Sequence, residues 1–186
     1  MPPELRRKLF TANDCNRMAE AGILLPDDRV ELIRGEILKM SPVGPRHGAS
    51  VDGAARVMMR LAGDRAIVRV QGTVELDPYA APQPDIAVLR FRDDFYLAKN
   101  PGTPDIVLIV EVADSSLEYD TTVKVELYAI LGIPEYWVAD LRNNRLFVYS
   151  HPVESGYQNI REFRRGDIVA PGLLTQCSID VGVLLP

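Results

Sequence analysis

The chain has 186 residues, of which 47% are hydrophobic and 25% charged, and its formal net charge at pH 7 is −5. A chain of this length suits one domain with a single core. The acidic balance excludes a protein that is basic throughout, although it leaves room for a local basic surface. Two cysteines are too few for a disulfide framework. No apolar run reaches the ~18 residues of a membrane span, so we expect a cytoplasmic globular protein.

Capping residues and the spacing of apolar residues predict the elements of the N-terminal half. Thr11 would cap the first helix, and Arg34-Gly35 would form the turn of a tight hairpin. In chain order we expect a helix over 12–21, a hairpin over 29–40, a helix over 46–62, and strands over 66–76 and 85–90.

The C-terminal half is built around its most apolar run, residues 106–112. This run is short and rich in β-branched residues, which favours a central strand over a helix. A helix over 121–131 follows, with Asp120 or Thr121 as its N-cap, and then a strand pair over 135–140 and 145–150. Weaker strand signals continue to the C-terminus. Strands that arrive as hairpins with helices between them predict the α/β class, with a central mixed β-sheet flanked by helices. We expect an N-terminal arm over 1–10 and a single domain over 11–186.

Two carboxylates stand where apolar strands begin and end. Glu111 ends the strand over 106–112, and Asp85 opens the strand over 85–90. If these strands are antiparallel neighbours, both carboxylates lie at one edge of the sheet, where they repel each other unless a cation lies between them. Oxygen ligands favour a hard cation such as Mg²⁺. The alternative is structural: Glu111 meets solvent or an arginine, and Asp85 is an ordinary acid at a strand start.

A lysine and a third acid belong to the same hypothesis. Lys124 falls in the first turn of its helix, where a cation opposes the helix dipole. A lysine there is useful if negative charge develops during a reaction at the same sheet edge. Glu31 shares a face of the predicted hairpin with Ile33 and Leu38, a face more apolar than a solvated carboxylate favours. The alternatives are a solvated lysine and an ordinary edge-strand acid.

Together these residues resemble the Uma-two family of restriction-endonuclease-like proteins, which have the PD-(D/E)XK nuclease fold. The resemblance covers roughly residues 10–185, and its specificity lies in the order and spacing of its motifs. These motifs are VELIRGE over 30–36, Pro84-Asp85, IVEV over 109–112, Lys124, Tyr128, and GIPEYW over 132–137. The usual lysine of the superfamily, two residues after the strand acid, is absent, because that position is Ala113. The resemblance therefore implies that the active-site lysine is Lys124, on the following helix.

The resemblance implies a metal-dependent nuclease, and it assigns a role to each residue of the motif. Asp85 and Glu111 would be the acidic ligands of Mg²⁺, with Mn²⁺ as an alternative, and the main-chain carbonyl of Val112 would complete the inner ligands. Lys124 would orient or activate the attacking water and stabilise the anionic transition state. Glu31 would assist metal or water binding.

Weaker correspondences concern substrate and partners. His47 matches a family position near phosphate, and Gln71 is a candidate for the pocket wall; ordinary packing is the alternative for His47. Cleavage of a duplex needs two active sites, so we expect a homodimer, with Pro134–Trp137 near its interface; the alternative places Tyr136 and Trp137 in the core. Basic residues available for phosphate contacts are Arg6, Arg7 and Lys8, then Arg60, Arg65 and Arg69, and then Arg161, Arg164 and Arg165.

The expected function is hydrolysis of phosphodiester bonds in nucleic acid, with DNA as the expected substrate and a metal as cofactor. The first alternative is a module with the same fold that binds nucleic acid or a protein partner without cutting it. The second is a structural protein whose acids are satisfied by internal salt bridges.

Overall fold

The fold is described by a computed structural model that covers residues 7–25 and 27–185. Most of the predicted N-terminal arm, residues 1–6 with the basic Arg6, lies outside the described residues. The helices are α1 (Ala12–Glu20), α2 (Pro45–Ala62), α3 (Leu117–Thr121) and α4 (Val123–Ile130), with short 3-10 turns at η1 (Gly63–Arg65), η2 (Thr103–Asp105) and η3 (Val181–Val183). None of the helices in the described ranges combines the length and apolarity needed to cross a membrane.

A six-stranded mixed sheet organises the molecule. Its strands, in spatial order, are β3 (Ala66–Val70), β4 (Ile86–Arg90), β5 (Ile106–Ala113), β6 (Glu135–Asp140), β7 (Arg145–Val153) and β8 (Gly156–Arg164). Neighbouring strands are antiparallel except for the parallel pair β5–β6. Two small ribbons stand apart from this sheet, β1 (Val30–Ile33) with β2 (Glu36–Lys39) and β9 (Ile168–Val169) with β10 (Ile179–Asp180). The predicted α/β class with a central mixed sheet is confirmed.

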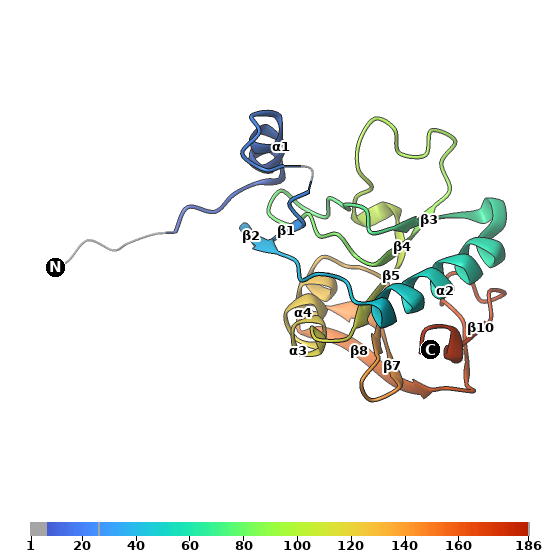
Figure 1. The fold of residues 1–186 in the computed structure, drawn as a ribbon. Coiled ribbons are helices and arrows are strands. Elements are labelled where there is room, and N and C mark those ends of the chain that lie inside the picture. The colour runs from blue at the N-terminus through green and yellow to red at the C-terminus, as the bar shows by residue number, and fades with distance from the viewer. Residues whose placement is uncertain (1–6, 26, 186) are drawn as a thin grey trace.

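The two faces of the sheet carry different helices, and β5 contributes to both. Val110 and Val112 pack into one apolar cluster with α2, whereas Ile109 and Ala113 pack into the other cluster with α4. Figure 1 shows α2 on one side of β5 and the α3–α4 pair on the other. Since side chains alternate along a strand, Glu111 points to the α4 side.

The register of β4 and β5 brings the two predicted acids together. The strands are antiparallel, and Ile86 is paired with Val110. Asp85 precedes Ile86 and Glu111 follows Val110, so the two carboxyl residues meet at one end of this strand pair. The predicted antiparallel pairing is confirmed.

The β1–β2 hairpin also forms where the sequence predicts it. Glu31 is paired with Leu38, and both Glu31 and Ile33 are buried. At the turn, Arg34 has φ 51° and Gly35 has φ 80°, the left-handed backbone of a tight hairpin turn.

Two predicted elements have wrong boundaries. The strand predicted over 66–76 ends at Val70, because Gln71 takes a left-handed backbone with φ 47°. The helix predicted over 121–131 is two helices that break at Thr122, where φ is −122° and ψ is −77°. Neither Asp120 nor Thr121 is therefore an N-cap: both belong to α3, where Asp120 is buried, while Lys124 still lies in the first turn of α4.

The aromatic residues near the start of β6 are in the core. Tyr136 and Trp137 have no exposed surface, and Trp137 donates a hydrogen bond to the buried carboxylate of Glu135. The alternative that places Tyr136 and Trp137 in the core is confirmed. A dimer interface near Pro134–Trp137 stays a prediction.

Candidate active site

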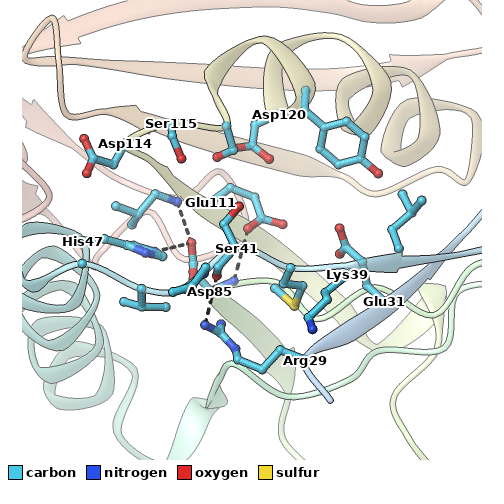
Figure 2. A pocket seen from close by; sticks show the side chains of 18 of the residues that line it. Arg29, Glu31, Lys39, Ser41, His47, Asp85, Glu111, Asp114, Ser115 and Asp120 are labelled. Carbon is cyan, nitrogen blue, oxygen red and sulfur yellow. Dashed lines mark hydrogen bonds and ion pairs between the residues drawn. The ribbon is translucent and has the colours of Figure 1, made fainter. Parts of the chain in front are cut away.

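A pocket of about 430 Å³ opens where β4 and β5 meet the β1–β2 hairpin and the start of α2. This volume lies in the range of small-molecule sites, roughly 300–1,000 Å³. Figure 2 shows the carboxylates of Asp85 and Glu111 near its centre. The charged side chains and the histidine that line it are Arg29, Glu31, Lys39, His47, Asp85, Glu111, Asp114, Asp120 and Lys124.

Asp85 is buried at the start of β4 and held by three neighbours. Its Oδ2 accepts a hydrogen bond from the main-chain N–H of Val112 at 2.9 Å and lies 2.9 Å from Nε2 of His47. Its Oδ1 accepts a hydrogen bond from the amide of Gln71 at 3.3 Å. Burial, and then the charge of Glu111, raise the pKa of Asp85 to about 7. The carboxylate is thus fixed in place but poorly compensated.

Glu111 is paired with the predicted lysine. Lys124 Nζ lies 2.9 Å from Glu111 Oε1, which also accepts a hydrogen bond from the Tyr128 hydroxyl at 3.2 Å. Although burial opposes it, Glu111 and the other nearby acids raise the pKa of Lys124 well above its ordinary value. The lysine is therefore a permanent cation at this end of the sheet.

Two further acids share the same ammonium group. Glu31 Oε2 lies 3.2 Å from Lys124 Nζ, and Asp120 Oδ1 lies 3.9 Å away. Apart from this contact with Lys124, the buried Glu31 Oε2 has no partner among the described residues. Burial raises the pKa of Glu31, against the opposing effect of Lys124. Burial and the charge of Glu111 raise the pKa of Asp120 to about 7. One lysine thus serves three buried acids.

The donor atoms suit a hard divalent cation. Asp85 and Glu111 offer carboxylate oxygens side by side, and the acids of the cluster outnumber its cations. In a β-strand the N–H and C=O groups of one residue point to the same side. The Val112 N–H donates to Asp85, so the Val112 carbonyl lies on that same edge of β5. Within residues 7–25 and 27–185, no three His, Cys, Asp or Glu side chains are arranged around a common metal position. Two carboxylates and a main-chain oxygen would therefore be completed by water, as is usual for Mg²⁺.

The two weaker candidates both contact Asp85. His47 lies in the first turns of α2 and lines the pocket. Burial lowers the pKa of His47 against the opposing charge of Asp114, and Arg29 lowers it further. Gln71 is not among the residues that line the pocket, and its side-chain amide donates a hydrogen bond to Asp85. This geometry suits a positioning role for Gln71.

Several lining residues were missed by sequence reasoning. Asp114 and Asp120 lie on one side of the pocket, and Arg29 and Lys39 lie on the other (Figure 2). One signal could have found Arg29: it stands two residues before Glu31, so strand alternation puts both on one face. Asp120 was missed because residues 117–121 were not predicted to be helical; on a helix it stands four residues before Lys124, and that spacing is the available signal.

The raised carboxyl pKa values predict an unusual pH dependence of stability for the metal-free protein. Asp85 has a pKa of about 7 in the fold against an ordinary value of 3.8, so between these pH values the folded state holds a proton that the unfolded state has lost. The free energy of unfolding should then fall as pH rises from about 4 to 7, by about 1–3 kcal/mol. Thermal melts of chelator-treated protein at pH 5 and pH 8 check this. An Asp85→Asn variant should give a flatter profile, and a profile as steep as that of the wild type would contradict the assignment.

Comparison with known proteins supports a nuclease relationship. The family model described as "Uma2: Putative restriction endonuclease" matches residues 15–182. A crystal structure described as "a putative nuclease belonging to DUF820 from Anabaena variabilis ATCC 29413" superposes with a TM-score of 0.74 at 16% sequence identity. The superposition covers 94% of this chain and 97% of the other, and at this identity it establishes the fold alone. No curated protein sequence matches the chain.

Proposed function

The chain belongs to the Uma2 family of restriction-endonuclease-like proteins, and from this premise we propose that it is a metal-dependent nuclease that hydrolyses phosphodiester bonds in DNA. One observation carries the proposal. Asp85 and Glu111 meet at the ends of adjacent antiparallel strands, inside a pocket, with the Lys124 ammonium 2.9 Å from Glu111. A buried acid pair beside a fixed cation costs stability, so its presence in a pocket favours a catalytic role over a structural one.

The residues fit Mg²⁺, with Mn²⁺ as a substitute. Asp85, Glu111 and the Val112 carbonyl would hold the ion. When bound, the ion supplies a Lewis acid that polarises the scissile phosphate and favours ionisation of water.

The remaining steps belong to the side chains of the chain itself. Water attacks phosphorus, the bond from phosphorus to the leaving oxygen breaks, and negative charge builds on the phosphate oxygens. Lys124 stabilises that charge, because its ammonium group is held at the site before the reaction. Glu31, whose Oε2 lies 3.2 Å from Lys124 Nζ, accepts a proton of the attacking water. His47 and Gln71 hold Asp85 in position.

A cleavage panel tests the proposal. Plasmid, linear and branched DNA, with RNA as a comparison, would be incubated with Mg²⁺ or Mn²⁺ and either the wild type or Glu111→Gln. We expect cleavage by the wild type only, and a metal-dependent rise in its melting temperature that the variant loses.

Glu135→Gln is the matched control, since Glu135 is as buried as Glu111 but lies on β6 outside the pocket. It should lower stability while leaving cleavage intact. Failure of every substrate, with nucleic acid still bound, would favour the non-catalytic module instead. A melting temperature indifferent to either metal would favour the structural alternative. Light scattering on the same samples tests the proposed homodimer, which double-strand cleavage requires.

A further inference from the structure

The pocket has a basic side that the proposed chemistry does not use. Arg29 and Lys39 line it from the β1–β2 hairpin, and Figure 2 shows them across the pocket from Asp114 and Asp120. Lys124, the other cation of the pocket, is paired with Glu111 and Glu31 and already has a role in the proposed chemistry.

These two cations are not neutralising the acids. Among the residues that the structure describes, no carboxylate forms an ion pair with either Arg29 or Lys39. Asp114, another acid that lines the pocket, is paired instead with Arg142 at 3.8 Å. Arg29 is half-buried and Lys39 is exposed where they line the pocket, and two cations that pair with no described carboxylate can bind an anion that enters between them.

Arg29 makes one hydrogen bond, and its other donors have no partner among residues 7–25 and 27–185. One of its terminal N–H groups donates to the main-chain oxygen of Ser41 at 3.3 Å, which ties the half-buried side chain to the segment before α2. A guanidinium has five N–H donors in a planar fork, so the others can bind phosphate oxygens. The start of α2 adds to the positive potential, since Gly44 caps it without a side chain and its first turn carries no acid.

We propose that Arg29 and Lys39 form a subsite for a backbone phosphate of the nucleic acid, next to the phosphate that is cut. This inference rests on the proposed nuclease function and adds to it the side on which the substrate strand enters. The strand would cross the pocket with the cut phosphate at Asp85 and Glu111 and its neighbour at the hairpin. Local charge of this kind lets a protein of net charge −5 hold a polyanion.

Salt-dependent binding tests the subsite. A fluorescein-labelled oligothymidylate would be titrated by fluorescence anisotropy across a salt series, with Ca²⁺ in place of Mg²⁺. Each lost phosphate contact should reduce the slope of log K against log salt by about one, so Arg29→Ala should bind about tenfold more weakly at low salt with a shallower slope. Lys39→Ala should behave similarly, and Arg29→Lys should keep most of the slope because it keeps the charge.

Arg34→Ala is the matched control, because Arg34 sits at the tip of the same hairpin, pairs with Glu126 and does not line the pocket. It should leave affinity and slope unchanged. An unchanged slope in Arg29→Ala and Lys39→Ala, an equal effect in Arg34→Ala, or no salt-dependent binding by the wild type would overturn the subsite. Melting temperatures of all variants identify any that fail to fold.

Cleavage with Mg²⁺ separates the two proposals. If the wild type cuts DNA, replacing the phosphate beside the cut by a neutral methylphosphonate should slow cleavage by the wild type. The same replacement should slow cleavage by Arg29→Ala much less, because this variant has already lost the charge that pairs with that phosphate. Additive effects would overturn the subsite and leave the nuclease standing. Binding that depends on Arg29, with no cleavage of DNA, would overturn the nuclease and leave the subsite standing.

Discussion

Replacing Asp85 by Asn is expected to abolish metal-dependent cleavage while making the metal-free protein more stable. The substitution keeps the shape of the side chain but removes one of the two charges that meet at the strand ends. Loss of a metal ligand should lower activity by more than the roughly 10–100-fold typical of an outer-shell partner. At pH 8 the same change relieves a carboxylate whose pKa is raised to about 7, so the melting temperature should rise.

Opposite changes in activity and stability separate a catalytic acid from a structural one. Gln71→Ala is the graded comparison, because Gln71 only donates to Asp85. Gln71→Ala should raise the metal concentration needed for a given rise in melting temperature by about 10–100-fold. It should not raise the melting temperature of the metal-free protein. Kinetic assays and thermal melts of both variants with and without Mg²⁺ check this. Full cleavage by Asp85→Asn, or a lower melting temperature in the absence of metal, would contradict the assignment.

The centre of the site was predictable because it depends on strand direction and local pattern. An acid at the start of one strand and another at the end of its antiparallel neighbour must meet, and Asp85 and Glu111 do. Glu31 was predictable from its apolar hairpin face, and Lys124 from its place one short loop after Glu111. Each of these inferences uses contacts close in sequence or one strand pairing.

The outer parts of the site depend on contacts that local pattern does not encode. Asp120 lies 3.9 Å from Lys124 at i,i+4 spacing, but the local pattern did not place residues 117–121 in a helix, so the pair was missed. Arg29 and Lys39 reach the pocket because the hairpin folds across the strand ends, far from them in sequence. The strand predicted over 66–76 stops before Gln71. This residue donates a hydrogen bond to Asp85 and has a left-handed backbone, which the alternation of apolar and polar residues does not signal.

Lys124 should be the residue on which the fold of the site depends most. Its ammonium lies within 4 Å of Glu31, Glu111 and Asp120, all buried. Lys124→Met fills a similar volume but leaves these acids without a cation, and breaking a buried pair in this way costs about 3–5 kcal/mol. For a chain of this size the loss corresponds to a fall in melting temperature on the order of 10 °C. The fall should be larger at pH 8 than at pH 5, because the uncompensated carboxyls can take up protons at the lower pH.

A second substitution tells electrostatic loss from poor packing. Glu111→Gln in the Lys124→Met background removes the acid that lay 2.9 Å from the ammonium, so it should restore part of the lost stability. Lys99→Met, at an exposed position outside the pocket, should change the free energy of unfolding by no more than about 0.5 kcal/mol. A double variant no more stable than Lys124→Met would point to packing, and Lys124 would then not be the cation that holds these acids. Partial rescue without recovery of cleavage is the expected pattern, since the same lysine stabilises the acids before the reaction and the phosphate charge during it.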